Sequence, residues 1–195
     1  MKSSLNIFTK CPFTGNPKSR LSNFLTKEER IFLSEYMLVN ILEEISTIKN
    51  ISINLWVYPT YEKKFFKELS LKYKLNLFNQ VGNSLYERMQ DCMIRESKKF
   101  EKVILIGSDI PSLTNKFIND TISHLDKKNY VIGPSKDGGF YLLGAKEFKY
   151  RDIHLSKYRY SNYLSITKIL DKKTIPYSLL MKLKDIDTKD DLLLL

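Results

Sequence analysis

Asp109 follows a run of four apolar residues, Val103 to Ile106, within the segment Gly107-Ser108-Asp109-Ile110-Pro111. An apolar run of this kind is typical of a parallel strand that is buried on both faces. Ligands of open parallel sheets bind just beyond the carboxyl ends of the strands, so we expect Asp109 at the mouth of a site. Its carboxylate suits a divalent metal ion that also contacts phosphate oxygens. A turn before Pro111 that Asp109 merely caps is the alternative.

A basic loop follows the first expected strand, Leu5 to Thr9. It runs from Lys10 to Arg20 and contains Gly15 and Lys18. Glycine lets backbone N–H groups approach a phosphate, and lysine and arginine supply positive charge. The loop has neither the G-x-G-x-x-G pattern nor the spacing of a P-loop. It is a candidate phosphate-binding loop, with a basic surface loop as the alternative.

A glycine-rich turn, Asp137-Gly138-Gly139, separates the expected strands Tyr130 to Ile132 and Phe140 to Gly144. Asp-Gly before an alternating strand is a strong hairpin signal, so a purely structural turn is one interpretation. Because a strand also ends here, we expect the turn beside Asp109, where its glycines would let the backbone approach a ligand. The pattern places Tyr141 equally well in the core or in a pocket.

Two carboxylates near the end of the chain, Asp185 and Asp187, lie two residues apart. In an extended segment this spacing puts both on one face. The alternative is that Asp187 or Thr188 caps the last helix. No Ser-His-Asp set is arguable, because His124 lies on an expected helix and His154 stands alone in an expected loop.

The elements that must position these segments alternate between strand and helix. Capping boxes at Thr26 with Glu29 and at Ser84 with Glu87 begin two of the helices. The alternation predicts right-handed βαβ units in an α/β fold: a three-layer α/β/α sandwich with a mostly parallel, Rossmann-like sheet. The expected strands are Leu5–Thr9, Ile51–Tyr58, Leu75–Phe78, Val103–Gly107, Tyr130–Ile132, Phe140–Gly144 and Ile175–Leu179. The expected helices follow Thr26 and Ser84 and span Thr60–Tyr73, Thr114–Leu125 and Tyr163–Asp171, with a last turn at Leu192–Leu195.

Length and composition predict one domain, residues 1–195, with a net charge of +10. No run reaches the roughly 18 apolar residues of a membrane span, and no secretory leader is evident, so we expect a cytoplasmic protein. Cys11 and Cys92 provide neither a disulfide framework nor a metal-ligand spacing. The lysines are scattered, which disfavours a nucleic-acid partner and suits a small phosphorylated ligand. The sequence leaves the assembly open, with a homodimer as a candidate.

Taken in order along nearly the whole chain, these segments resemble the small GT-A-like glycosyltransferase family, transferases of a radical SAM- or selenium-associated type. The chain is also similar, more distantly, to molybdenum cofactor guanylyltransferase and phospholactate guanylyltransferase. The resemblance is carried by Phe8–Pro12 with Gly15, Lys18, Arg20 and Leu21, by Leu85 and Glu87–Met89, by Gly107–Pro111, by Gly133, Pro134 and Asp137–Gly144, and by Asp185–Thr188 with Asp191 and Leu192. The chain departs from the family pattern at Ser19, Ser84, Tyr86 and Tyr160.

The resemblance implies a fold of the GT-A nucleotide-diphospho-sugar transferase type that works with Mg²⁺ or Mn²⁺. It implies a nucleotide or nucleotide-sugar as one substrate and a small-molecule acceptor as the other. The site residues it implies are Lys10, Gly15, Lys18, Arg20 and Ser108 for the nucleotide phosphates, Asp109 and Asp187 for the metal, Asp109 and Asp137 for catalysis, and Gly138, Gly139 and Tyr141 for the acceptor pocket.

Three functions follow as hypotheses. The first is a metal-dependent glycosyltransferase that uses a nucleotide-activated sugar donor. The second is a nucleotidyltransferase of the guanylyltransferase type, in which a phosphorylated acceptor attacks the α-phosphate of a nucleoside triphosphate and pyrophosphate is released. The third is a non-catalytic basic binding module with a degenerate pocket.

Overall fold

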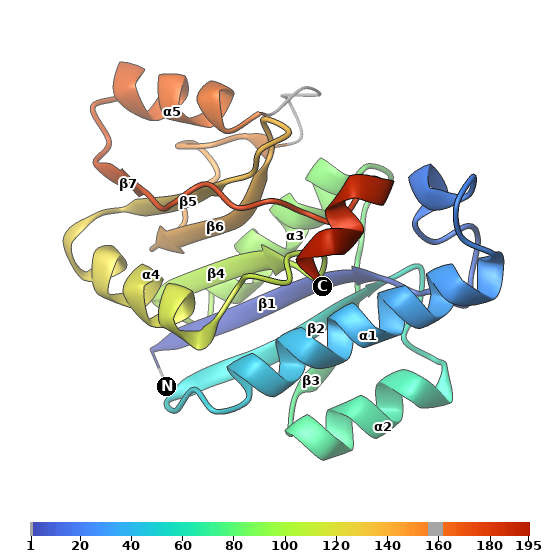
Figure 1. Ribbon diagram of the computed structural model, residues 1–195. Coiled ribbons are helices and arrows are strands. Elements are labelled where there is room, and N and C mark those ends of the chain that lie inside the picture. The colour runs from blue at the N-terminus through green and yellow to red at the C-terminus, as the bar shows by residue number, and fades with distance from the viewer. Residues whose placement is uncertain (1, 156–161) are drawn as a thin grey trace.

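The computed structural model describes residues 2–155 and 162–195. Within these residues, seven strands form one sheet in the order β3-β2-β1-β4-β6-β5-β7 (Figure 1). Neighbouring strands are parallel from β3 to β4, β6 is antiparallel to both of its neighbours, and β7 is parallel to β5. The strands are β1 (Ser3–Lys10), β2 (Ile51–Tyr58), β3 (Asn76–Asn79), β4 (Lys102–Gly107), β5 (Tyr130–Pro134), β6 (Phe140–Lys146) and β7 (Tyr177–Leu179).

Helices cover both faces of the sheet, which confirms the predicted three-layer α/β/α architecture. Helices α1, α2 and α4 share one buried apolar cluster with the sheet, and α3 and α5 share another on the opposite face. Alternation along β1 divides its side chains between the layers: Ile7 belongs to the first cluster and Phe8 to the second. The helices are α1 (Lys27–Ile45), α2 (Lys64–Tyr73), α3 (Leu85–Ser97), α4 (Asn115–Lys127), α5 (Tyr163–Lys172) and the short 3-10 turns η1 (Ser19–Leu21) and η3 (Lys189–Leu194).

The predicted helix starts agree with the structure at both capping boxes. Thr26 accepts a hydrogen bond from the backbone N–H of Glu29, whose side chain accepts one from the Thr26 N–H in return. Ser84 and Glu87 make the same exchange at the start of α3. Thr114 occupies the first capping position of α4 but makes no capping hydrogen bond with its side chain.

The alternation of strand and helix is interrupted at β5 and β6, where the structure is less regular than the expected series of βαβ units. These strands form a hairpin, and β6 inserts between β4 and β5. The Asp137-Gly138 turn signal is thus confirmed as a hairpin, with Gly138 at a φ of 94° that favours glycine. Gly133 is required for another reason: a Cβ atom there would lie 2.4 Å from the ring of Tyr141.

The strand order reverses between β1 and β4, because β1 leads to β2 on one side while β4 pairs on the other. Ligands of open α/β sheets bind at such a reversal, outside the carboxyl ends of the strands. The first loop and the segment around Asp109 leave the sheet at this point. Across residues 2–155 and 162–195, no helix combines the length and the apolar character needed to cross a membrane.

Candidate functional site

Four segments that are distant in the sequence meet beyond the carboxyl ends of β1, β4 and β5. The backbone N–H of Ile186 donates to the carbonyl of Asp109 over 3.1 Å, which joins the segment at 183–187 to the end of β4. The N–H of Lys136 donates to the carbonyl of Leu183 over 2.9 Å, which joins the same segment to the β5–β6 turn. The first loop reaches this segment through Lys18, whose ammonium donates to the Ile186 carbonyl over 2.8 Å.

Lys18 is the cation at the centre of this arrangement. Its ammonium lies 3.0 Å from a carboxylate oxygen of Asp109. The lysine side chain is only 7% exposed, whereas that of Asp109 is 50% exposed. The backbone of Lys18 has a φ of 47°, a left-handed conformation that is uncommon for a residue with a side chain and is found preferentially at functional sites. The first loop is therefore shaped to place one buried positive charge beside Asp109.

Arg20 and Asp187 form a second ion pair at the same edge of the sheet, which is called the rim below. Both side chains are accessible, at 69% and 32% exposure. Thr188 caps η3 in a capping box with Asp191. This agrees with the alternative interpretation of the segment, in which Asp187 or Thr188 caps the last helix. Asp187 thus pairs with Arg20 of the first loop, and the neighbouring Thr188 caps η3.

A cavity of about 310 Å³ opens between the end of β4, the β5–β6 turn and the start of α3. Of the predicted site residues, Asp109, Asp137, Gly139 and Tyr141 line it. Its described lining consists of Leu85, Tyr86, Met89, Gly107, Asp109, Ile110, Ser135, Asp137, Gly139, Phe140, Tyr141 and Asp185.

The lining of this cavity does not include the other predicted site residues, which are Lys10, Gly15, Lys18, Arg20 and Ser108 for the phosphates, Asp187 for the metal and Gly138 for the acceptor pocket. Lys10 and Gly15 are exposed in the first loop. Ser108 is buried, and its hydroxyl donates to the hydroxyl of Thr9 over 3.2 Å, which ties the ends of β1 and β4 together. Gly138 shapes the hairpin turn, and its carbonyl accepts from the N–H of Tyr163 at the start of α5.

Asp137 is held in place by its own turn. One carboxylate oxygen accepts hydrogen bonds from the hydroxyl of Ser135 and, over 2.8 Å, from the backbone N–H of Gly139. The Asp137 carboxylate is part of the lining of the cavity. These bonds fix the direction of the carboxylate, as a group that orients a substrate requires.

Tyr141 forms the floor of the cavity and is itself 4% exposed, so it belongs to both core and pocket. Its hydroxyl donates to the carbonyl of Met181 over 3.0 Å. Burial raises the pKa of the Tyr141 hydroxyl to about 12. The phenol is therefore neutral at physiological pH and acts as a wall of the site.

Asp185 is the site residue whose role the sequence analysis missed, although it noted the residue beside Asp187. The side chain of Asp185 lines the cavity, whereas that of Asp187 does not. Burial raises the pKa of the Asp185 carboxyl, and the negative charges of Asp137, Asp187 and Asp109 raise it further. Carboxylates from three separate segments thus lie near enough for their charges to affect one another.

The start of α3 supplies an apolar wall opposite the carboxylates. Leu85, Tyr86 and Met89 line the cavity from this helix. Ser84, where the chain departs from the family pattern, is the capping residue that starts the helix, and Tyr86 is a departure that faces the cavity. Another departure, Tyr160, lies outside the described residues.

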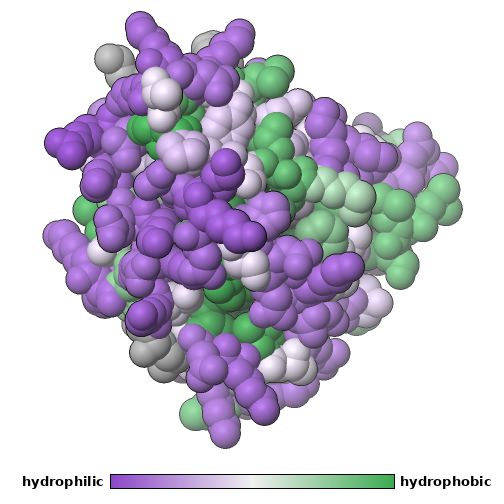
Figure 2. Space-filling view, turned by 90° about the vertical axis from the view of Figure 1, so that its left-hand side faces the viewer, coloured by the Kyte–Doolittle hydropathy of each residue, from purple (hydrophilic) through white to green (hydrophobic). Residues whose placement is uncertain are grey.

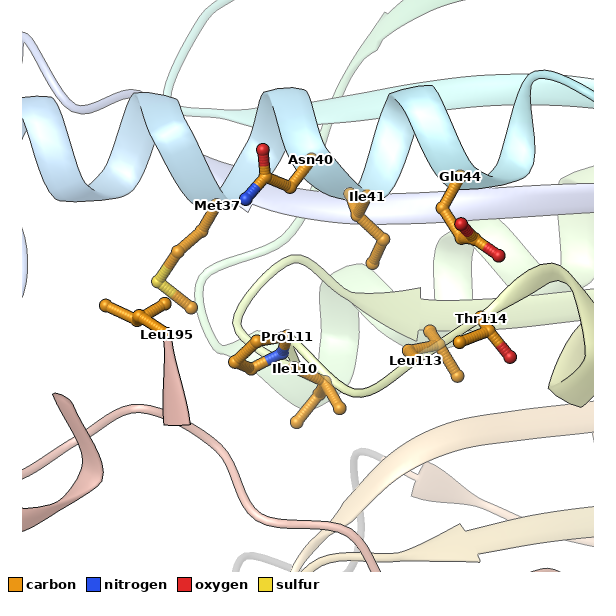
Figure 3. Close-up of a pocket in the computed structure, with 9 residues that line it drawn as sticks. All are labelled: Met37, Asn40, Ile41, Glu44, Ile110, Pro111, Leu113, Thr114 and Leu195. Atoms are coloured by element: carbon orange, nitrogen blue, oxygen red, sulfur yellow. The ribbon is translucent and has the colours of Figure 1, made fainter. Parts of the chain in front are cut away.

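A second cavity, of about 200 Å³, lies between α1 and the loop that follows β4. Figure 3 shows Met37 and Leu195 at one end of it and Glu44 with Thr114 at the other. Ile110 lines both cavities and separates them. None of the predicted site residues lines the second cavity, which therefore is not the candidate site.

Comparison with known proteins places these features in a family context. Residues 41–162 match the family model DUF2064, "Uncharacterized protein conserved in bacteria". Among solved structures, the fold is similar to a protein assigned as a nucleotide-diphospho-sugar transferase from Desulfovibrio desulfuricans G20, with a TM-score of 0.85 and 21% identity over 96% of this chain and 83% of that chain.

Two curated relatives are similar over most of the chain. The 2-phospho-L-lactate guanylyltransferase of Methanobrevibacter ruminantium is 30% identical over 191 residues, which covers 91% of this chain and 79% of the relative. The enzyme of the same name from Methanocaldococcus vulcanius is 27% identical over 180 residues, covering 90% and 76%. The radical SAM or selenium association finds no support among these matches. The chain therefore belongs to the DUF2064 family, is related to the 2-phospho-L-lactate guanylyltransferases and is a transferase by that kinship.

Proposed function

We propose that this protein is a nucleotidyltransferase that transfers a nucleoside monophosphate from a nucleoside triphosphate to an acceptor oxygen. The observation that carries the proposal is the buried Lys18 ammonium, held between Asp109 and the Ile186 carbonyl at the point where the strand order reverses. The curated relatives favour this reaction over our first hypothesis of glycosyl transfer, because they are guanylyltransferases. GTP is accordingly the first triphosphate to test.

The first loop binds the triphosphate in this proposal. Lys18 and Arg20 contribute two positive charges on one side of the rim, and both already hold carboxylates that phosphate oxygens would replace or join. Charge-assisted hydrogen bonds of this kind are about twice as strong as neutral ones. Gly15, at a φ of 75° with open space around it, lets the loop backbone come close to a phosphate.

The carboxylates at the rim suit a divalent cation. Asp109, Asp137 and Asp185 line one cavity, and carboxylate oxygens are the hard ligands that Mg²⁺ and Mn²⁺ take. The described residues contain no group of three close acidic, His or Cys side chains, so oxygens of substrate and water would complete the shell. Asp109 and Asp185 would hold such an ion within the cavity, and Asp187 would stay with Arg20. Once bound, the ion would neutralise charge on the phosphates of the leaving group.

Asp137 orients the acceptor. Its carboxylate is fixed by Ser135 and Gly139 and faces the cavity from the turn opposite Asp109. An acceptor hydroxyl that donates to this carboxylate would have its oxygen directed toward the triphosphate. Pyrophosphate leaves without needing a proton relay between side chains. Orientation of the acceptor and stabilisation of the charge on the phosphates therefore supply the catalysis.

The non-catalytic hypothesis requires a concentrated basic surface. Figure 2 shows hydrophilic residues over much of one face of the molecule, interrupted by patches of hydrophobic residues. The basic side chains at the rim are paired with carboxylates. A polyanion would have to break these pairs along an extended surface, whereas a single triphosphate needs only the pairs beside the cavity of about 310 Å³.

Thermal-shift measurements with each triphosphate and with nucleotide-sugars, with and without Mn²⁺, test the proposal. A triphosphate at about 100 times its Kd stabilises the folded state by about 2.7 kcal/mol, and each kcal/mol raises the Tm by roughly 2–4 °C for a chain of this size. We expect that rise with a triphosphate and Mn²⁺, and its loss in Asp109→Asn but not in Asp120→Asn, which alters an exposed carboxylate of α4. Stabilisation by nucleotide-sugars alone would contradict nucleotidyl transfer.

A further inference from the structure

A buried glutamine, Gln80, joins the carboxyl ends of three strands. It follows β3 directly, and its backbone N–H donates to the carbonyl of Val57 in β2 over 3.0 Å. Its side-chain amide donates to two further carbonyls, that of Trp56 in β2 over 2.9 Å and that of Thr9 in β1 over 3.1 Å. A single side chain therefore sets how the ends of β1, β2 and β3 lie relative to one another.

Arg88, near the start of α3, holds the oxygen of the same side chain. Its Nε–H donates to the Gln80 side-chain oxygen over 3.0 Å, and a terminal N–H of the guanidinium donates to the carbonyl of Gly82 over 3.3 Å. The guanidinium also lies over the ring of Tyr58, 4.0 Å from its centre, and the residue is buried. This arrangement uses the planar fork of donors that distinguishes arginine from lysine.

The turn between β3 and α3 brings Arg88 within reach of Gln80. Gly82 in this turn has a φ of 135°, and a Cβ atom there would lie 2.8 Å from the Cβ of Glu87 and 2.9 Å from the backbone nitrogen of Arg88. Only glycine permits so close an approach in this conformation. The Glu87 carboxylate also accepts from the backbone N–H of Asn83 over 2.8 Å, which ties the turn to the helix.

This network supports the point where the first loop leaves the sheet. Gln80 holds the carbonyl of Thr9, the last residue before the loop, while the Thr9 hydroxyl accepts from Ser108 on the other side. Tyr58, beneath the Arg88 guanidinium, accepts a hydrogen bond through its backbone carbonyl from the N–H of Cys11 over 2.7 Å. The loop that carries the Lys18 ammonium therefore starts from a fixed base.

We propose that Gln80 and Arg88 are positioning residues of the nucleotidyl transfer, which hold the first loop so that the ammonium of Lys18 meets the phosphates of the triphosphate. This inference rests on the proposed function and gives a role to two buried residues that are not part of the described lining of the cavity. They act through Thr9 and Tyr58 rather than by contact with the substrate. Groups that bind a reacting molecule depend on such support, because a displacement of about 1 Å can cost up to about 100-fold in rate.

Gln80→Glu tests the link to the loop with little change of shape. The carboxylate still accepts from Arg88, but it donates no hydrogen bond to the carbonyls of Thr9 and Trp56. We expect the Kd for GTP with Mn²⁺, measured by calorimetry, to rise by about tenfold, which is a difference of about 1.4 kcal/mol. Another triphosphate replaces GTP if the thermal shift identifies one. Asn79→Asp adds a negative charge at the adjacent exposed position and is the matched control, which should bind as the wild type does.

Arg88→Lys separates position from charge. Lysine keeps the positive charge but not the fork that bonds Gln80 and the Gly82 carbonyl together, so we expect a similar rise in Kd. Arg95→Lys is the matched control, because Arg95 lies on the same helix and its guanidinium also lies over an aromatic ring, that of Trp56, at 5.0 Å. It should bind as the wild type does. A wild-type Kd in Arg88→Lys would show that charge is sufficient and would contradict the positioning role of Arg88.

Combination with Lys18→Met distinguishes positioning from a general loosening of the fold. If Gln80 acts through Lys18, adding Gln80→Glu to Lys18→Met should raise the Kd no further, because the two residues serve one interaction. Independent effects would instead multiply, and a Kd equal to that product would overturn the proposal. The Tm of each variant without ligand verifies that the measured protein is folded.

The failures of the two proposals are distinguishable. A wild-type Kd in both Gln80→Glu and Arg88→Lys overturns the positioning role while the nucleotide shift of the wild type stands, and a lowered Tm in these variants would then assign the network to stability alone. Absence of any triphosphate-dependent thermal shift in the wild type overturns nucleotidyl transfer itself, and this inference with it.

Discussion

The ammonium of Lys18 and the carboxylate of Asp109 form an ion pair of 3.0 Å across the reversal point between β1 and β4. The pair is asymmetric, because the lysine is buried and the aspartate is half-exposed. A buried charge needs a partner, so a ligand that draws Asp109 away must itself supply negative charge to Lys18. In the proposed reaction a triphosphate with a divalent cation would do both at once, because the cation would bind the carboxylate and a phosphate would bind the ammonium.

Replacing Lys18 by Met keeps the length of the side chain and removes its charge. We expect the Kd for the triphosphate to rise by roughly 10- to 100-fold, since a hydrogen bond to a charged group contributes about 1.5–3 kcal/mol. Calorimetric titration in the presence of Mn²⁺ measures it. Lys49→Met, which alters an exposed lysine before β2, is the control and should bind as the wild type does. An unchanged Kd in Lys18→Met would contradict the phosphate role of the first loop.

Arg20 tests whether a charge beside the cavity serves nucleotide binding rather than the stability of the fold. Its pair with Asp187 is accessible to water on both sides, and exposed pairs contribute only about 0–1 kcal/mol to stability. Arg20→Ala should therefore leave the denaturant midpoint within about 0.5 kcal/mol of the wild type while it raises the Kd for the triphosphate several-fold. A clear loss of stability with unchanged nucleotide binding would make the pair a structural clamp.

Local signals in the sequence were enough to group the segments of the candidate site. Each segment follows an apolar strand, and parallel strands bring their carboxyl ends to one edge, so Lys18, Asp109 and Asp137 could be grouped without coordinates. Both capping boxes were equally local, because donor and acceptor lie three residues apart. These features depend on spacing alone, and the structure agrees with them.

Hydrogen bonds between segments far apart in the sequence determine the features that local patterns do not predict. The choice between Asp185 and Asp187 depends on the path of one extended segment, which the N–H of Ile186 fixes by donating to the Asp109 carbonyl. Side chains two residues apart share a face of an extended segment, so a shift of two residues would put Asp187 in the place of Asp185, and no local pattern sets that register. The insertion of β6 between β4 and β5 has the same origin, since the turn predicts the hairpin but not which strand its second arm joins.

Gly133 tests the packing under the cavity. A Cβ atom there would lie 2.4 Å from the ring of Tyr141, which is buried and bonded through its hydroxyl to Met181. Gly133→Ala should destabilise the protein by about 1–3 kcal/mol, the range of overpacked cores. Gly107→Ala is a matched control, because nothing lies within 4 Å of its Cβ position and its backbone is not left-handed. Chemical denaturation of both variants measures the difference, and equal losses would show that the ring of Tyr141 yields easily.

Asp191 predicts how stability depends on pH. Burial alone would raise the pKa of its carboxyl, but the Lys184 ammonium, the Thr188 hydroxyl and the backbone N–H groups of Asp187 and Thr188 hold the pKa well below its usual range. A carboxyl whose pKa is lowered by folding adds stability above its unfolded pKa of about 3.9, and this contribution is lost as the pH falls toward the folded value.

Asp191→Asn should therefore destabilise the protein near neutral pH, by roughly 2–3 kcal/mol for a network of charged hydrogen bonds. The gap to the wild type should narrow as the pH falls below about 4, whereas Asp190→Asn, at an exposed position, should follow the wild type throughout. Urea denaturation at a series of pH values measures both curves, and a gap that stays constant down to acid pH would show that Asp191 contributes through its shape rather than its charge.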